Sequence, residues 1–150
     1  MAGGQIYGQA CSSAYVISAN GGDWYLQNKF KATAWSNDTG FFFPVRLKKL
    51  DGYISWVSGN SVYDWDPSST EYKNSCGDVT FGIDKVLNVS VTVQLCPNKI
   101  IPYDVTGTSS GAQWLGNEVD NDPDGVAGWQ EVHSPSNAAS TWSTGFSVTW

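Results

Sequence analysis

The residues best suited to chemistry are four carboxylates in the last third of the chain. Asp120, Asp122 and Asp124 occupy alternate positions before Gly125, and Glu131 stands twelfth in the run. This is the spacing of a calcium-binding loop, in which alternate carboxylates supply hard oxygen ligands and the final Glu binds through both oxygens. The sequence therefore predicts a Ca²⁺ site with Asp120, Asp122, Asp124 and Glu131 as ligands. The flanking residues lack helical periodicity, so an EF-hand is not expected, and a solvated acidic turn is the alternative.

Three tryptophans stand beside carboxylates or amides in segments rich in turn residues. Trp65 lies between Asp64 and Asp66, Trp114 follows Gln113, and Trp129 precedes an amide. A sugar presents apolar C–H patches ringed by hydroxyls, so a flat aromatic ring edged by Asp or Gln suits it. The sequence predicts a lectin-like glycan site in which the three rings stack and the polar neighbours bind hydroxyls: Asp64, Trp65, Asp66, Gln113, Trp114 and Trp129. Tryptophans that pin long loops are the structural alternative.

Catalytic patterns are missing from the sequence. His133 is the only histidine, and no nucleophile elbow or phosphate-binding loop is present. The sequence therefore predicts a non-enzymatic binding protein. A small glycoside hydrolase that uses a carboxylate pair is kept as an alternative.

Charge is distributed unevenly along the chain. Residues 1–99 carry eight basic and eight acidic side chains, whereas residues 100–150 carry six acids and no Lys or Arg. An acidic chain of this kind lacks the basic surface that nucleic acids require. The expected partner is a glycan or glycoconjugate, with homo-oligomers as a further expectation. The rival interpretation is a membrane-active cytolysin or defence protein, in which the same aromatic side chains insert at the lipid interface.

Period-two alternation runs through most of the chain and predicts strands. It is clearest over 87–95 and 142–150, and it recurs over 24–32, 41–47 and 78–83. Segments 53–57 and 61–65 are expected to form a hairpin, and residues 107–140 are expected to be long acidic loops with short strands. Tryptophans within the strand patterns are expected in the core: Trp24, Trp35, Trp56, Trp142 and Trp150. The predicted fold is one all-β domain over residues 1–150, an antiparallel β-sandwich of the jelly-roll-like or Greek-key kind, with a β-barrel or β-trefoil as alternatives.

The three cysteines allow one disulfide. Segments 78–83 and 87–95 are expected to form a hairpin through a turn near Asp84. Cys76 and Cys96 bracket this hairpin and are expected to pair in an oxidising compartment, leaving Cys11 free. The first residues do not have the pattern of a signal peptide. The expected location is extracellular, either as a mature secreted protein or as one that is exported unconventionally, and the cytosol is the alternative.

In its acidic, tryptophan-rich composition the chain resembles small β-proteins such as fungal and bacterial lectins, carbohydrate-binding modules and aegerolysin-type cytolysins. The resemblance implies a sugar-binding or membrane-active β-domain. It assigns no individual residue.

Overall fold

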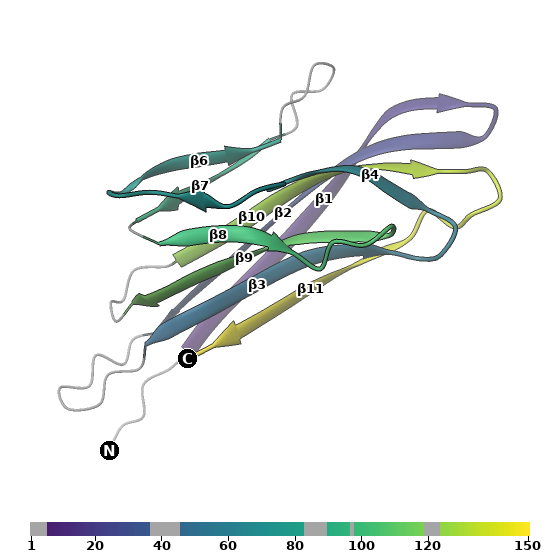
Figure 1. The fold of residues 1–150 in the computed structure, drawn as a ribbon. Helices are drawn as coiled ribbons and strands as arrows, with labels where there is room; N and C mark the ends of the chain where they lie inside the picture. Colours follow the sequence, from purple (N-terminus) through teal and green to yellow (C-terminus); the bar gives the residue numbers. More distant parts are fainter. Residues whose placement is uncertain (1–5, 37–45, 83–89, 97, 119–123) are drawn as a thin grey trace.

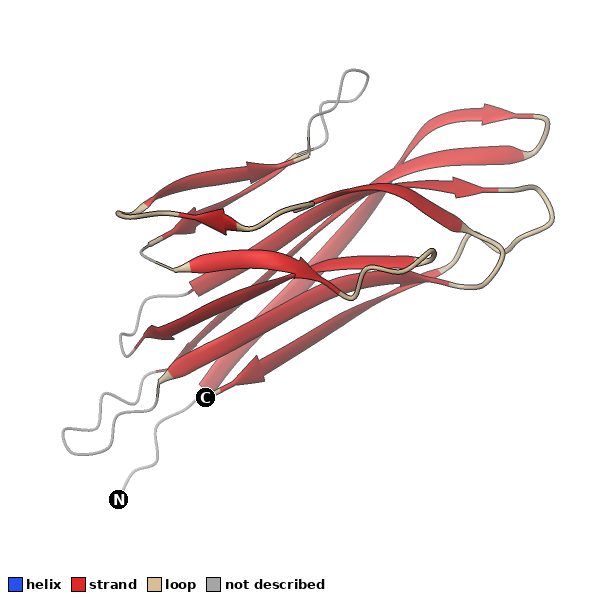
Figure 2. Cartoon of the chain, viewed as in Figure 1, coloured by secondary structure: helices blue, strands red, loops and turns tan. Residues whose placement is uncertain are grey.

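The computed structural model of the chain describes residues 6–36, 46–82, 90–96, 98–118 and 124–150. These residues form strands and connections without a helix (Figure 2). No helix within the described ranges therefore has the length and hydropathy that crossing a bilayer requires. The strands are β1 Ile6–Asn20, β2 Asp23–Ser36, β3 Leu47–Trp56, β4 Ser61–Asp66, β5 Glu71–Tyr72, β6 Gly77–Phe81, β7 Val91–Leu95, β8 Lys99–Tyr103, β9 Ser109–Glu118, β10 Asp124–Ser134 and β11 Trp142–Thr149.

The strands pair antiparallel in three sheets, two of which form a sandwich (Figure 1). One layer has the order β1-β2-β10-β4, and the other has the order β11-β3-β9-β8-β5. The third sheet is the two-stranded hairpin β6-β7, which packs against β10. The predicted antiparallel β-sandwich is thereby confirmed.

Alternate residues of both layers fill the space between them. Phe30, Leu50, Ile54 and Val126 are among the side chains buried there, as period-two patterning requires. The Phe30 ring lies directly over Gly128, where an added Cβ would come within 2.5 Å of the ring. Glycine is needed at this strand position because an aromatic ring occupies the space of a side chain.

A buried polar network also ties the two layers together. The Trp56 indole N–H donates to Gln130 Oε1 at 2.6 Å, and Gln130 Nε2 donates to Ser110 Oγ at 2.8 Å. Gln130 comes from β10, whereas its partners come from β3 and β9 of the other layer. Satisfied buried polar groups of this kind favour one alignment of the layers over others.

The β6-β7 hairpin carries the predicted disulfide. Cys76 and Cys96 directly flank its two strands and are bonded, while Cys11 is free and exposed. Val79, Phe81, Val93 and Leu95 are buried, and the residues between them face solvent. The described half of the 87–95 prediction is therefore confirmed, and residues 87–89 lie outside the described residues.

Two sequence predictions about connectivity are wrong. Residues 107–140 are not long loops, because β9 and β10 occupy most of them and β10 lies inside its layer. Segments 53–57 and 61–65 do not form a hairpin, because β3 and β4 belong to different layers and the turn 57–60 crosses between them. Most of the predicted strand 41–47 lies outside the described residues.

Candidate functional site

Four of the six predicted glycan-site residues line one hollow. Strands β4 and β10 pair so that Asp66 lies opposite Trp129 and Asp64 lies opposite Glu131. A hollow of about 270 Å³ opens there, lined by Asp64, Trp65, Asp66, Ser68, Gly82 and Trp129. We call it the carboxylate hollow. Its volume is close to the lower end of the range of small-molecule sites, about 300 Å³.

Local backbone contacts hold the two aspartates in place. Asp64 Oδ1 accepts the Trp65 N–H at 2.9 Å, and Asp66 Oδ2 accepts the Gly82 N–H at 2.8 Å. Gly82 has a φ of 83°, and a Cβ added there would lie 2.6 Å from the Trp129 ring. Only glycine fits this position, since both the backbone conformation and the ring exclude a side chain.

Trp129 contributes mainly buried surface to the hollow. It is 5% exposed, and its indole N–H is buried without a hydrogen-bond partner. An unsatisfied buried donor costs about 1–3 kcal/mol. Trp65 is half-buried and therefore offers more ring surface to a ligand than Trp129 does.

The other two predicted residues lie elsewhere, so their assignment to this site is wrong. Trp114 is on β9, 1% exposed, within the core. Gln113 donates from Nε2 to Asp51 Oδ1 at 2.7 Å, in the layer that does not contain β4. Both were assigned to a loop because glycines flank them, but these glycines lie inside a strand.

Two of the predicted calcium ligands, Asp124 and Glu131, lie too far apart to bind the same ion. Asp124 and Glu131 lie on the same strand, whose pairing with β2 is continuous between them. Seven residues of extended strand separate their Cα atoms by about 23 Å, and calcium holds its ligands at about 2.3–2.6 Å. The two carboxylates cannot share an ion, so the twelve-position loop is wrong. Asp120 and Asp122 lie outside the described residues.

Glu131 is instead engaged in a side-chain cluster on the outer face of its layer. Its Oε1 accepts a hydrogen bond from Gln27 Nε2 at 2.6 Å. Burial, followed by the hydrogen bond that it donates to Glu131, raises the pKa of Tyr63 well above its usual range. Tyr63 is therefore a neutral donor throughout the physiological range. In the described ranges, no group of three His, Cys, Asp or Glu is placed to hold a metal.

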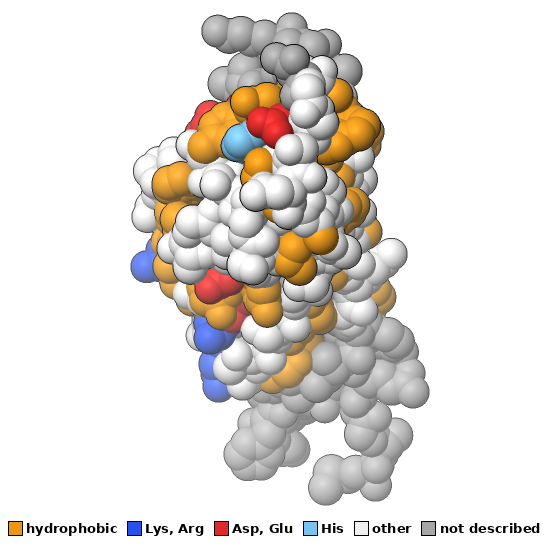
Figure 3. Space-filling view, turned by 90° about the vertical axis from the view of Figure 1, so that its right-hand side faces the viewer, with side chains coloured by type: hydrophobic (Ala, Val, Ile, Leu, Met, Phe, Trp, Pro, Cys, Tyr) orange, Lys and Arg blue, Asp and Glu red, His pale blue; other side chains and the backbone are white. Residues whose placement is uncertain are grey.

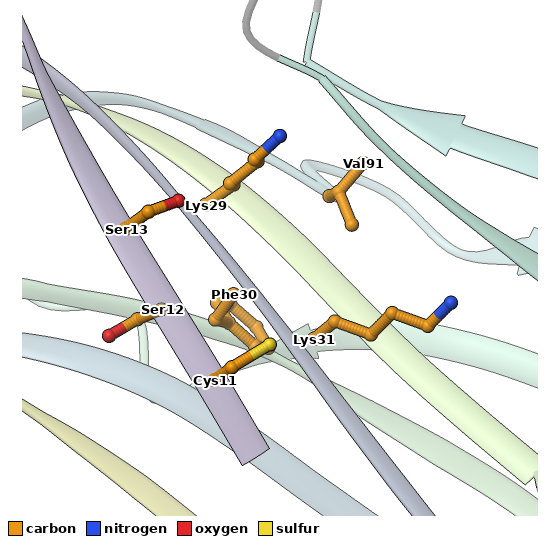
Figure 4. Close-up of a pocket in the computed structure, with 7 residues that line it drawn as sticks. All are labelled: Cys11, Ser12, Ser13, Lys29, Phe30, Lys31 and Val91. Atoms are coloured by element: carbon orange, nitrogen blue, oxygen red, sulfur yellow. The ribbon is translucent and has the colours of Figure 1, made fainter.

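A second hollow, of about 380 Å³, lies between the β1-β2 ribbon and β7 (Figure 4). Lys29 and Lys31 extend across it from β2 and donate to the carbonyls of Ser90 and Thr92, at 3.1 and 3.3 Å. The lysines thereby satisfy carbonyls on the free edge of the β6-β7 hairpin, which otherwise attracts other strands. We therefore assign this hollow to the packing of the β6-β7 hairpin against β2 and not to ligand binding.

Four connections lie at the right-hand end of the sandwich in Figure 1. They join β1 to β2, β3 to β4, β8 to β9 and β10 to β11. We call this end the turn end. Seven large hydrophobic side chains that are 38–48% exposed lie in these connections or in the strand segments leading to them: Tyr15, Val16, Trp24, Val57, Tyr63, Val105 and Trp142. Tyr72, 60% exposed, lies outside the turn end on β5. Figure 3 views this end and shows hydrophobic surface around the single histidine.

The turn end also holds a contact between a histidine and a carboxylate that no sequence pattern indicated. His133 Nε2 lies 3.2 Å from Asp23 Oδ2, and Asp23 Oδ1 accepts the Ser136 N–H at 2.9 Å. The Ser136 N–H, and then His133, lower the pKa of Asp23 below its usual value. The histidine ring also stacks on Tyr25, with centroids 4.8 Å apart. Since Asp23 and His133 are far apart in sequence, no spacing signal could have joined them.

These features define the chain as an antiparallel β-sandwich with an aromatic end and an acidic side hollow. No protein-family model matches the sequence, and no curated protein matches it as a relative. Among solved structures it is similar to Clostridium perfringens delta-toxin, with a TM-score of 0.49 and 8% identity, over 95% of this chain and 79% of that one. It is also similar to a structure named "Pore forming protein", with a TM-score of 0.44 and 7% identity, over 98% and 91% of the two chains. Likeness at this level transfers no function.

Proposed function

We propose that the protein is membrane-active and contacts the bilayer surface with its turn end. The observation that supports this is the gathering of seven of the eight exposed large hydrophobic side chains of the described residues at one end of the sandwich. Scattered exposed apolar residues are ordinary on a soluble protein, whereas their concentration at one end of the molecule favours an interaction site there. This is the alternative that the sequence analysis placed second.

The residue types at the turn end suit a membrane interface. Trp and Tyr have an apolar ring and a polar group, and they concentrate where hydrocarbon meets water. Trp24 and Trp142 are 42% and 38% exposed, and Tyr15 and Tyr63 are 40% and 48% exposed. Valines at 16, 57 and 105 add aliphatic surface between the rings.

Charge at the turn end argues for zwitterionic lipid. The connections 21–22, 57–60, 104–108 and 135–141 contain no Lys or Arg, and Asp104 is their one acidic residue. Attraction to anionic headgroups needs basic residues near the surface and weakens with salt. We therefore expect binding to phosphatidylcholine vesicles that neither anionic lipid nor low ionic strength strengthens.

Vesicle co-sedimentation tests the proposal, with dye release measured in parallel as the test of cytolytic action. Binding and release that occur with phosphatidylcholine vesicles support a membrane-active protein. Binding that requires anionic lipid would contradict the role of a turn end whose connections contain no Lys or Arg. An extracellular place of action belongs to this proposal, because the Cys76–Cys96 disulfide persists in oxidising surroundings.

Glycan binding at the carboxylate hollow is the second candidate. It is supported by the convergence of Asp64, Trp65, Asp66 and Trp129 on one hollow, although Trp65 alone offers a substantial ring surface. A glycan array tests it, with Trp65→Ala as the variant that should lose the signal. An unchanged signal in this variant would place the sugar elsewhere.

A further inference from the structure

Two edge strands on one side of the sandwich contain no charged side chain. They are β1 and β11, the edge strands of the two layers, and they run side by side (Figure 1). Neither strand contains Asp, Glu, Lys or Arg, and residues 1–22 as a whole contain none. In a chain of net charge −6, such a side is distinctive.

The strand β1 is a long edge with little protection against pairing. It has 15 residues and is hydrogen-bonded along one side only, to β2. Natural edge strands are usually short, or carry Lys, Pro or a bulge that prevents another strand from adding. β1 has neither Lys nor Pro, and its one irregularity in register lies between Val16 and Ser18, toward its end. Residues 8–11 in its first half are exposed, and the central residues 12–14 are partly exposed.

Contacts with β11 hold β1 in place without covering its backbone edge. Ser12 Oγ lies 2.6 Å from Thr144 Oγ1, and the Trp142 indole N–H donates to Ser12 Oγ at 3.4 Å. A Cβ added at Gly8 would lie 2.6 Å from the Phe146 ring. These are side-chain contacts between the layers, so the outer N–H and C=O groups of β1 have no strand partner within the described structure.

The charge pattern points to a second copy of the same chain as the occupant. Two copies of net charge −6 repel one another in most orientations. At the opposite edges, β4 presents Asp64 and Asp66 and β5 presents Glu71, so self-contact there would oppose carboxylates. β1 and β11 contain no carboxylate that would be opposed in such a contact. A patch that contacts its own copy closes as a two-fold dimer.

We propose that β1 pairs antiparallel with β1 of a second copy, so that the four-stranded layer continues through the dimer. Full overlap of the two strands places Ser13, the central residue of Ile6–Asn20, opposite Ser13 of the partner subunit. Directly opposed residues of an antiparallel pair have Cα atoms about 4.5–5.5 Å apart, within the range that a disulfide spans.

The test is the mass of the protein in solution, without membranes, from micromolar to submillimolar concentration. The expected result is a dimer that dissociates on dilution, and Ala10→Lys should weaken it by about tenfold or more. Ser58→Lys, which adds the same charge at an exposed residue of the turn 57–60, should leave the dimer unchanged. Thermal melts of both variants show whether each is folded.

Cross-linking tests the strand assignment independently of charge. In a Cys11→Ser background, Ser13→Cys should form a disulfide-linked dimer under mild oxidation, whereas Ser58→Cys should not. A wild-type chain that stays monomeric at the highest concentration would overturn the proposal. So would a dimer that persists in Ala10→Lys and does not cross-link through residue 13.

Discussion

Replacing Trp24 by alanine removes one of the largest rings of the turn end. The ring is 42% exposed in the free protein. An aromatic side chain buries about 150–250 Å² in full, so 0.42 of that, about 60–105 Å², is left for the membrane to cover. At about 25 cal/mol per Å², its burial contributes about 1.5–2.6 kcal/mol. We therefore expect Trp24→Ala to weaken vesicle binding by about 10- to 100-fold.

Co-sedimentation with phosphatidylcholine vesicles over a range of lipid concentrations measures this change. The matched control is Tyr72→Ala, because Tyr72 is 60% exposed but lies on β5, outside the turn end. It should bind vesicles as the wild type does. Equal losses in the two variants would indicate non-specific adsorption through any exposed ring. Unchanged binding in Trp24→Ala, with its fold intact by thermal melt, would refute the reasoning.

Three further predictions concern stability. Gly82→Ala should destabilise the protein by about 2–4 kcal/mol in urea unfolding, because its positive φ strains a residue with a Cβ and that Cβ would collide with the Trp129 ring. Gly107→Ala is the control and should change the stability little, because open space surrounds Gly107. The Ser136 N–H lowers the pKa of Asp23 below its usual value, so the ionised carboxylate stabilises the folded state above the usual pKa of Asp, and this stabilisation is lost as the pH falls through the lowered pKa. In melts over a range of pH, Asp23→Asn should therefore lose less stability on acidification than the wild type does. If calcium binds near residues 120–124, millimolar Ca²⁺ should raise the melting temperature relative to EGTA. Glu131→Gln should show the same rise, because Glu131 lies too far along β10 to be a ligand. Loss of the rise in this variant would contradict the strand geometry of β10.

Period-two alternation was a reliable guide wherever the alternating residues were large. It located β2, the described part of β7 and β11, and together with the cysteine spacing it led to the hairpin and its disulfide. These features are local, so a short stretch of sequence contains them.

Strands rich in glycine were misread as loops. Gly111 and Gly116 lie inside β9, and Gly128 lies inside β10. The sequence shows them as turn residues, but Gly128 is required because Phe30 occupies the space above its backbone. That ring comes from a distant part of the chain, so the reason for the glycine is visible only after folding.

The assignment was wrong for four of the eight tryptophans, whereas Trp56 is buried as expected. Trp114 and Trp129, expected to stack on a ligand, are buried, whereas Trp24 and Trp142, expected in the core, are 42% and 38% exposed. Alternation predicts which side of a strand a residue faces. It does not predict whether the other layer extends far enough to cover that side. Trp142 lies on β11, an edge strand of its layer, so no further strand of that layer flanks it within the described residues.

A fluorescent label at the turn end tests most directly whether that end meets the membrane. An environment-sensitive fluorophore is attached through Ser58→Cys in a Cys11→Ser background, because Ser58 is exposed in the turn between β3 and β4. The comparison is Ser69→Cys in the same background, exposed beyond the far end of β4. On addition of phosphatidylcholine vesicles, the emission of the label at position 58 should shift to the blue while the label at position 69 stays unchanged. A shift confined to position 69, or no shift at either position while the protein binds the vesicles, would contradict contact through the turn end.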